Sequence, residues 1–436
     1  MITPTPTLSS LLHLISVGIT TSSSLTPFDP GFNISAVAAL AESLPTHSWE
    51  FGTATEALLE LHSPLLSVFG PAPFPDAVYH PDSVPSLSYA AANIVLGTGA
   101  NGLSDGAGAV GDPASLGVAA VMLGKTNASF AAAAESEIDY IVDAAPRWVN
   151  GAISQRGKVP ELWADFMFMA PPFLAYYAAD SRNVSLLEIA YRQCGLQREV
   201  LLFGSNSSTL SPINSSPTNG LWHHIVGPQS AEPGLWSTGN GWASMGMARV
   251  LATILKAPAP PATPWRADAI ADLTGWIKEI VDGARAAPLD GGLLRNYLND
   301  TTTAHGFGEI SGSSMLAAVA YRMAILAPEA FPAATYVAWA DTIRVELGKN
   351  DAAGNPHITS EGIVTPAVNP LGWGDTAPWT AGSPEGNNFV VLMYAAWRDC
   401  IWAGVCTRPL LAAAGSKIMT QKPNAARWYK EFIARQ

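Results

Sequence analysis

The sequence predicts an all-α protein in which antiparallel helix pairs close into an α/α toroid. Apolar residues recur at helical spacing in segments of roughly 12 to 16 residues, and loops rich in Gly and Pro separate these segments. No run of alternating apolar and polar residues indicates a sheet. An α-solenoid is the alternative, but the sequence lacks the self-similarity at a fixed period that repeat proteins show.

The expected helices follow one another along most of the chain. The Asp112-Pro113 pair is a strong start signal, because Asp caps a helix and Pro suits its first position. A Gly-rich loop over 97–111 lacks the Gly-Lys-Ser/Thr ending of a phosphate-binding loop, and the polar stretch 204–219 is expected at the surface. The expected helices are 33–44, 51–68, 86–96, 113–123, 130–144, 166–179, 186–202, 242–255, 265–285, 314–327, 334–347, 388–402 and 425–434.

The composition is that of an acidic globular protein. Of its 436 residues, 48% are hydrophobic and 13% are charged, which leaves ample material for a core. A net charge of -12 without a basic run argues against a nucleic-acid partner. The 14 Trp residues weakly favour a carbohydrate ligand, since Trp faces stack on sugar rings, although Trp is also a good core residue.

Several features predict secretion. Residues 11–19 form a short apolar run that resembles the core of a signal peptide, although no Lys or Arg precedes it. No later segment has about 18 uninterrupted apolar residues, so no membrane span is expected. We expect residues 1–28 to be a signal peptide or disordered leader and 29–436 to be a single catalytic domain. Six Asn-x-Ser/Thr sequons suit a secreted glycoprotein, at Asn33, Asn127, Asn183, Asn206, Asn214 and Asn299.

The three cysteines do not make a disulfide framework. Cys400 and Cys406 are close in sequence and could pair, which would leave Cys194 free. Their spacing fits no metal-binding motif.

Segments rich in polar and aromatic residues adjoin several of the expected helices. In residues 159–173, Asp165 is a single carboxylate within an apolar, aromatic run. Burial raises the pKa of a carboxyl, and a protonated Asp can act as a general acid. The alternative is that Asp165 caps a helix beginning at Phe166. The other segments, expected as loops at helix ends, are 111–117, 221–224, 234–242, 308–315 and 383–389.

In this combination and order, the segments resemble those of the unsaturated rhamnogalacturonyl hydrolases, glycoside hydrolase family 105, and the related unsaturated glucuronyl hydrolases, family 88. The resemblance covers about residues 112–397 and includes Leu-Trp-x-Asp, Trp-x-x-Gly-Asn-Gly-Trp and Glu-x-Ser-Gly. It implies an (α/α)6 barrel of six helical hairpins. It also implies a hydrolase that removes a terminal 4,5-unsaturated uronic acid from lyase-generated fragments of pectin (rhamnogalacturonan) or other uronic-acid glycans. An Asp protonates C4, water adds at C5, and the hemiketal collapses with loss of the sugar; no metal or cofactor is needed.

The resemblance also implies roles for individual residues. Asp165 matches the acid/base, and Asp112 matches a second carboxylate that would position Asp165 or the sugar; Asp112 could also be a helix cap. His224, with His223 beside it, matches a substrate-contacting His. The other expected substrate-binding residues are Trp163, Trp236, Thr238, Asn240 and Trp242. Trp242 could instead belong to the core, and Asn240 could be present because a Gly-flanked turn favours left-handed backbone.

The sequence departs from the family pattern at positions that would carry charge. Thr238 stands where the family commonly has Arg, Ser154-Gln155 stands in place of His-Lys, and Gly227 replaces an Asp. A Thr does not replace the bidentate contact that Arg makes with a carboxylate. Arg156, one residue from Gln155, could compensate.

These departures keep other functions open. One is a polysaccharide lyase or an ordinary uronidase on the same scaffold. An ordinary glycosidase holds two carboxyls about 5 to 9.5 Å apart, and Glu161, Glu309 and Glu385 are candidate partners. Another is a carbohydrate-binding protein that has lost catalysis. The expected partner is an oligosaccharide with a terminal uronic acid, with no nucleic acid and no membrane; the oligomeric state is not predicted.

Overall fold

Helices alternate between an inner and an outer ring along the chain. The computed structural model describes residues 26–75, 81–104, 106, 108–204, 220–258, 263–372 and 374–407. The inner ring of this part of the chain consists of α3 (Ser48–His62), α6 (Gly117–Gly124), α8 (Phe166–Asp180), α10 (Ser237–Lys256), α12 (Ile310–Leu326) and α14 (Pro384–Ala403). The outer ring consists of α2 (Ile34–Ser43), α4 (Pro85–Asn93), α7 (Ala128–Asp139), α9 (Val184–Leu201), α11 (Arg266–Ala286) and α13 (Ala333–Leu347).

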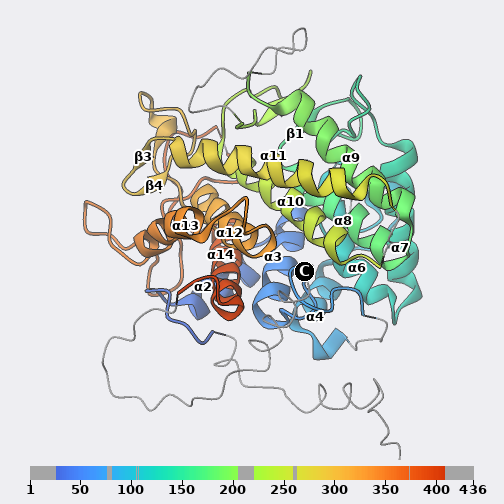
Figure 1. Ribbon diagram of the computed structural model, residues 1–436, viewed down its shortest axis with the longest axis horizontal. Coiled ribbons are helices and arrows are strands. Elements are labelled where there is room, and N and C mark those ends of the chain that lie inside the picture. Colours follow the sequence, from blue (N-terminus) through green and yellow to red (C-terminus); the bar gives the residue numbers. More distant parts are fainter. Residues whose placement is uncertain are drawn as a thin grey trace, which may run out of the picture.

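The inner helices pack side by side and close on themselves. Helices α8, α10, α12 and α14 contact one another in that order, and α14 returns to α3. Helix α3 reaches α8 through the four-residue helix α5 (Gly111–Ala114), and α6, which follows α5, also packs on α8. Each inner helix also packs on one outer helix, and α2 pairs with α14, so the first and last helices complete the ring. Figure 1 shows α7, α9, α11 and α13 on the outside of this (α/α)6 barrel, which confirms the expected fold class.

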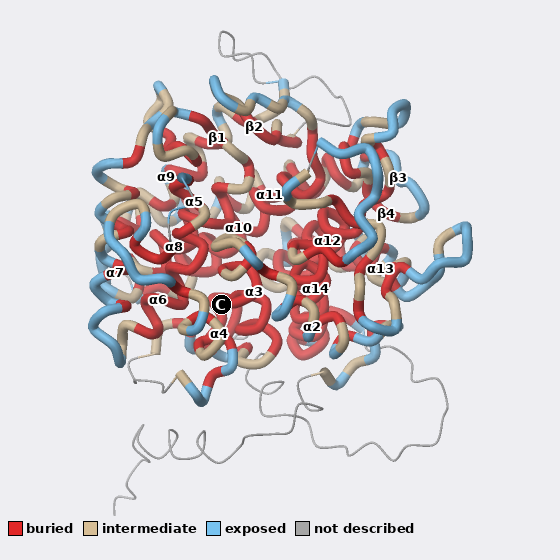
Figure 2. The backbone as a smooth tube through the Cα atoms, turned by 180° about the vertical axis from the view of Figure 1, so that it is seen from behind, coloured by how far each residue is buried: buried red, intermediate tan, exposed pale blue. Residues whose placement is uncertain are grey.

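Burial distinguishes the two rings. The inner helices are buried on nearly every side, whereas α11 buries one stripe that includes Leu273, Ile277 and Ile280, at the spacing of one helix face. In Figure 2, buried residues gather along α8, α10, α12 and α14, and exposed residues lie mainly in the outer loops. The apolar surface between the rings is therefore the core of the domain.

Most predicted helices are confirmed, but several boundaries differ. Helices α10, α12 and α14 begin at Ser237, Ile310 and Pro384, each before the predicted start, because the polar segments expected as loops form their first turns. The predicted helix 113–123 is divided into α5 and α6, and the predicted 130–144 ends in a π-helical turn, Tyr140–Ala144. The predicted 51–68 is α3, which starts and ends earlier. The predicted helix 425–434 and nearly all of the loop 204–219 lie outside the described residues.

Two short antiparallel ladders join loops at the barrel ends. Strands β1 (Leu162–Trp163) and β2 (Ile225–Val226) pair in the register Leu162↔Val226 and Trp163↔Ile225. Strands β3 (Leu289–Asp290) and β4 (Leu293–Leu294) form a hairpin in the register Leu289↔Leu294 and Asp290↔Leu293. The first ladder holds the loop before α8 against the loop before α10.

Charged side chains form a buried cluster between the inner helices. Glu60 of α3 accepts from Arg249 of α10 and, at 2.6 Å, from Arg322 of α12. Arg322 also donates to Asp399 of α14 at 2.6 Å. Arg249 donates in addition to Glu56 at 2.7 Å. All five side chains are nearly inaccessible to solvent, so this cluster ties four inner helices together.

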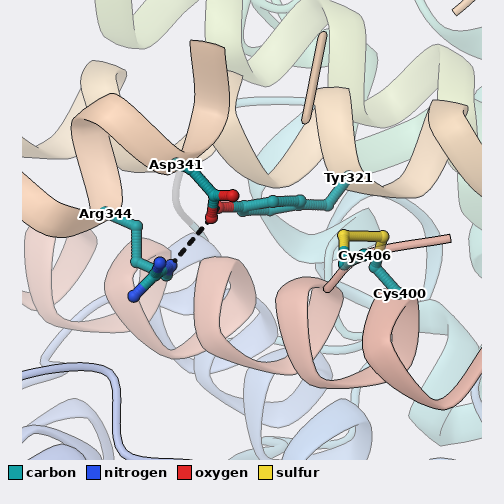
Figure 3. Close-up of a disulfide and its surroundings, with 5 residues drawn as sticks. All are labelled: Tyr321, Asp341, Arg344, Cys400 and Cys406. Atoms are coloured by element: carbon teal, nitrogen blue, oxygen red, sulfur yellow. Dashed lines mark hydrogen bonds and ion pairs between the residues drawn. A yellow bond between two sulfur atoms is a disulfide. The ribbon is translucent and has the colours of Figure 1, made fainter. Parts of the chain in front are cut away.

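The end of α14 is closed by a disulfide between Cys400 and Cys406, as the sequence suggested, and Cys194 is buried and free. Gly404 caps the helix in the left-handed conformation, with φ 77°, and turns the chain so that Cys406 returns to Cys400. Figure 3 shows this disulfide beside Tyr321, whose hydroxyl donates to Asp341 at 2.8 Å. Asp341 also accepts from Arg344 at 3.1 Å. These contacts fasten α13 to α12 next to the end of α14.

The described part of the chain contains no helix of the length and apolarity needed to cross a membrane. Residues 1–25 of the expected leader lie outside the described residues. Phe28, within the expected leader, packs on Trp397 with ring centroids 6.0 Å apart, and its carbonyl accepts from Tyr394 at 2.9 Å. Phe28 thus belongs to the folded domain.

Candidate functional site

The polar segments meet where the inner helices begin. The indole of Trp49, in the first turn of α3, donates to Glu385 of α14 at 3.1 Å. The hydroxyl of Thr238, in the first turn of α10, lies 3.4 Å from Glu309, which caps α12. Asp165 stands directly before α8. Because every second helix of the ring runs in the same direction, the motifs of all the inner helices share one end of the barrel.

Asp165 occupies the N-cap position of α8, but its side chain makes no cap hydrogen bond. The helix begins at Phe166, as the capping alternative required, yet Oδ2 of Asp165 lies 3.4 Å from Nε2 of His224. The β1–β2 ladder explains this contact, because it pairs the residues just before Asp165 with those just after His224. The carboxylate is thus directed to another side chain and not to the start of its own helix.

His224 is held between two carboxylates and two indoles. Its Nδ1 lies 3.1 Å from Glu232, and its ring lies 4.4 Å from the Trp236 ring and 5.6 Å from the Trp163 ring, between centroids. Burial lowers the pKa of His224, but the charges and hydrogen bonds of Asp165 and Glu232 outweigh burial and leave the pKa above its ordinary value. His224 therefore keeps its proton to a higher pH than an ordinary histidine, and Glu232 fixes the orientation of its ring.

Asp112 is not a helix cap. It lies inside the first turn of α5, and its Oδ1 accepts a hydrogen bond from Nε2 of Gln155 at 2.7 Å. Burial raises the pKa of Asp112 to about 6, the negative charge of Asp165 adds to the rise, and the Gln155 hydrogen bond opposes it. The effect of Asp165 indicates that the two carboxyls are electrostatically coupled.

Glu161 organises the edge of the site near Trp163. One carboxylate oxygen accepts from the Trp163 indole at 2.8 Å, and the other accepts from the backbone N–H groups of Gln229 and Ser230 at 2.7 and 2.6 Å. Burial raises the pKa of Glu161, but these hydrogen bonds and the charge of Arg156 hold it below its ordinary value. With its oxygens so engaged, Glu161 is a poor candidate for the second carboxylate of an ordinary glycosidase.

Gly227 is required by the position of Glu161. A Cβ placed on Gly227 would lie 2.3 Å from Cγ of Glu161. The Asp that the family pattern has at this position could not fit there. The replacement of Asp by Gly at this position is therefore explained by the packing of Glu161, and it need not reflect only the loss of a functional carboxylate.

Five of the expected substrate-binding residues are almost fully buried: His224, Trp236, Thr238, Asn240 and Trp242. Trp236 is 1% exposed and donates to Asn296 at 2.8 Å, so its contact with His224 is a supporting one. Trp242 is 0% exposed and packs on Phe168 and Phe389. Their placement favours structural roles over sugar stacking. Thr238 is also completely buried.

Asn240 lies inside α10 and not in a left-handed turn. Its side chain accepts from the backbone N–H of Trp222 at 2.8 Å and donates to the carbonyls of Trp222 and Trp236. It ties the loop before β2 to the start of α10, which fixes the position of His224 indirectly. His223 is half-buried beside Phe203 and Pro233, whereas Trp163 remains partly exposed next to His224.

Glu309 and Glu385 have different surroundings. Glu309 is fully buried and accepts from the backbone N–H groups of Ser311, Gly312 and Val368, so it is an N-cap; burial nevertheless raises its pKa. Glu385 is 4% exposed, and Trp49 is the donor to one of its oxygens, while the other oxygen has no hydrogen-bond partner among the described residues. Burial raises the pKa of Glu385 well above its ordinary value, and the charge of Asp165 adds to this. Glu385 therefore keeps its proton to a higher pH than an ordinary glutamate.

Two residues of this constellation were not expected from the sequence. Glu232 lies in a Pro-flanked loop that pairs back onto Ile225, and no motif marks it. Gln155 was noted only as a departure, and its bond to Asp112 depends on the backbone pairing of Val110 with Gln155. No group of three or more His, Cys, Asp or Glu side chains among the described residues could hold a metal ion.

Comparison with known proteins identifies relatives of this barrel. The model of Glycosyl Hydrolase Family 88 matches residues 120–350, just over half of the chain. The match includes Asp165, His224 and Thr238 and begins after Asp112. No curated protein matches the chain.

Solved structures share the fold at low sequence identity. A possible member of family GH105 from Salmonella enterica subsp. enterica serovar Paratyphi A has 13% identity and a TM-score of 0.61, covering 91% of this chain and 99% of that chain. The unsaturated glucuronyl hydrolase from Bacillus sp. GL1 has 15% identity and a TM-score of 0.54, covering 85% and 96%. A polysaccharide lyase has 14% identity and a TM-score of 0.57, covering 86% and 97%. These similarities show the fold.

Proposed function

The chain belongs to glycosyl hydrolase family 88, and from this premise we propose that it removes a terminal 4,5-unsaturated uronic acid from oligosaccharides that polysaccharide lyases leave behind. The observation that carries the proposal is the contact of Asp165 with His224, together with the coupling of Asp165 to a second carboxyl, Asp112. The glucuronyl hydrolase with the same fold is described as responsible for the degradation of glycosaminoglycan. The family and this constellation support a hydrolase of unsaturated uronides.

The proposed reaction is hydration of the C4=C5 enol ether. Asp165 donates a proton to C4, which leaves positive charge on C5 and the ring oxygen. Water then adds at C5, with Asp165 accepting its proton, and the hemiketal opens and releases the remaining sugar. His224 holds Oδ2 of Asp165, so Oδ1 is the oxygen offered to the substrate and to water.

The second carboxyl, Asp112, is proposed to hold the proton that the reaction uses. Burial and the negative charge of Asp165 raise the pKa of Asp112 to about 6, so Asp112 keeps its proton in mildly acidic conditions. In the proposed cycle, Asp112 passes this proton to Asp165, which donates it to C4; Asp165 then accepts a proton from the attacking water and returns it to Asp112. The enzyme is therefore proposed to work best in mildly acidic conditions.

We further propose that the substrate is a pectin fragment, from rhamnogalacturonan, and that the protein is a secreted glycoprotein. The Cys400–Cys406 disulfide supports secretion, because such bonds persist in oxidising compartments. The four sequon asparagines within the described residues, Asn33, Asn127, Asn183 and Asn299, are all exposed. Mass spectrometry of the protein secreted by its native host, before and after glycosidase treatment, tests this part of the proposal.

The test of activity follows the ultraviolet absorbance of the C4=C5 bond. Lyase-digested rhamnogalacturonan and lyase-digested glucuronic-acid glycans are incubated with the protein, and hydration removes the absorbance. Lyases leave the same unsaturated residue from galacturonate and from glucuronate, so loss of absorbance on only one substrate identifies the linkage and the neighbouring sugar that the enzyme accepts. Unchanged absorbance on both substrates with a folded protein would refute the proposal.

A second candidate is an ordinary uronidase. Glu385 favours it, because its carboxyl is buried, one of its oxygens has no hydrogen-bond partner among the described residues, and burial raises its pKa, as suits a general acid. Release of reducing ends from saturated uronides, without any change on unsaturated ones, would select this candidate.

A further inference from the structure

Arg156 lies against the partly exposed face of the site. Its guanidinium carbon is 4.4 Å from the centroid of the Trp163 ring, and the same indole lies 5.6 Å from the His224 ring, between centroids. His224 in turn contacts Asp165. The Trp163 indole therefore lies between Arg156 and the His224–Asp165 pair, which is proposed to take part in the reaction.

The surroundings hold Arg156 in place without using its terminal nitrogens. Its backbone N–H donates to Ser154 at 3.0 Å, and the segment pairs with Ala109. Nε lies 3.6 Å from Glu161, whose carboxylate is already fixed by Trp163 and two backbone N–H groups. Among the described residues, no hydrogen bond from Nη1 or Nη2 of Arg156 is present. With the side chain 27% exposed, that edge of the guanidinium can receive a ligand.

The charge of Arg156 offsets a strongly acidic environment. It lowers the pKa of both Asp112 and Glu161, so its field reaches the carboxyls of the site. An anionic sugar that approached Asp165 without a cation would be repelled by these groups. A guanidinium stacked on an indole, with its donor edge open, suits a planar carboxylate because two parallel N–H groups can bind both oxygens.

We propose that Arg156 binds the carboxylate of the terminal uronic acid and makes the enzyme selective for the free acid over its methyl ester. This inference rests on the proposed function, because it assigns the group that recognises the substrate of that reaction. Arg156 thereby takes a role that Thr238, fully buried against Glu309, is not placed to perform. In this proposal, the contact with the Trp163 ring holds the guanidinium in position for the carboxylate.

The experiment compares two substrates and three variants. The substrates are unsaturated galacturonides with a free carboxylate and the same compounds as methyl esters, both followed by loss of ultraviolet absorbance. In Arg156→Gln we expect KM for the free acid to rise about 10- to 100-fold, the range of a charged hydrogen bond, while kinetics on the ester stay unchanged. Arg156→Lys should recover part of the loss. Arg192→Gln, on the exposed face of α9, is the matched control and should behave as the wild type.

Each outcome separates the inference from the proposed function. If the wild type hydrates neither substrate, the proposed function fails. If the wild type is active and Arg156→Gln loses the same factor on acid and ester, Arg156 only supports Trp163 and Glu161, and the inference is wrong. If the variant keeps the wild-type preference for the acid, the inference is also wrong. Rates are measured at the pH optimum of each variant, because Arg156 also influences Asp112.

Discussion

At the scale of single residues, the carboxylates of the site differ in their hydrogen-bond partners: some contact other side chains, and others accept backbone N–H groups. Asp165 occupies an N-cap position, yet its carboxylate contacts His224 and makes no cap hydrogen bond to the helix. Asp112 is engaged by Gln155 and not by its own helix. Glu309 and Glu161, in contrast, accept backbone N–H groups and are structural. The burial and partners of a carboxylate distinguish the two groups.

The first prediction concerns Asp165→Asn. The variant should lose about 100- to 10,000-fold in kcat, because Asn cannot exchange the proton, while its melting temperature should stay near that of the wild type. Stability should be kept because the wild-type side chain makes no cap hydrogen bond to α8. Absorbance kinetics and thermal unfolding measure both quantities. A variant with full activity would remove Asp165 from the mechanism.

The second prediction concerns Glu232→Gln. Removing this carboxylate takes away one of the two charges that raise the pKa of His224, so the pKa should fall. His224 would then lose its proton at a lower pH, and its hold on Asp165 would weaken as the pH rises. Histidine NMR signals followed against pH report the shift. Glu188→Gln, on exposed α9, is the control; an unchanged His224 titration would show that Glu232 has no influence.

The third prediction concerns Gln155→Met. The Gln155 hydrogen bond favours the charged form of Asp112, so its removal should raise the pKa of Asp112 above about 6. If the shared proton is needed for the reaction, the alkaline limb of the pH–rate profile should move to higher pH. An alkaline limb that moves to lower pH, or that stays in place, would contradict the proposed use of the Asp112 proton in the reaction.

Sequence patterns pointed to the residues that we propose to react better than to the partners of those residues. Asp165, Asp112 and His224 were found because each lies in a motif of its family, and they come together in space. Glu232 and Gln155 carry no local signal, because their roles arise from backbone pairings of the loops 224–234 and 110–155. Trp236, Asn240 and Trp242 lie in the expected motif, but burial, which the motif does not reveal, makes their contacts internal.

At the scale of elements, the inner helices show why their starts were misplaced. Helical periodicity is read from apolar residues, and the first turns of α10, α12 and α14 are instead polar and rich in Gly and Ser. Their small residues are needed for close approach: a Cβ on Gly312 would lie 2.3 Å from Oγ of Ser237. The site thus lies at the first turns of the inner helices, where polar residues interrupt the apolar periodicity of the core.

The fourth prediction compares two glycines. Gly227→Ala should destabilise the protein by about 1 to 3 kcal/mol, because the new Cβ would collide with Glu161 at the β1–β2 ladder. Gly275→Ala, inside α11 where the Cβ meets no atom within 4 Å, should stabilise it by up to about 1 kcal/mol through helix propensity. Chemical denaturation measures both. Equal effects would show that close packing at Gly227 is unimportant.

At the scale of the whole molecule, the buried cluster around Glu60 joins helices that are distant in sequence. Glu60 meets arginines that lie 189 and 262 residues further along the chain. The fold class could be predicted because helix spacing is local information. The partners in this cluster could not be predicted, since a charged residue in an inner helix gives no sign of which other helix carries the opposite charge.

The fifth prediction concerns Glu60→Gln. The substitution leaves Arg249 and Arg322 without part of their compensating charge, and removing one partner of a buried ion pair costs about 3 to 5 kcal/mol. The melting temperature should fall clearly. Glu188→Gln, which breaks an exposed pair with Arg192, should cost at most about 1 kcal/mol. Similar melting temperatures for the two variants would show that the cluster does not hold the barrel together.

The pairing of α2 with α14 has a consequence for chain connectivity. The first outer helix pairs with the last inner helix, and Phe28 packs on Trp397, so the ring of hairpins is closed. The order of the hairpins around the barrel would be unchanged if a linker joined the two ends of the domain and the chain were opened elsewhere. The exposed turn at Gly354, between α13 and α14, is a suitable opening. A circular permutant opened there should therefore reach the same barrel, with α14 now at the front of the sequence.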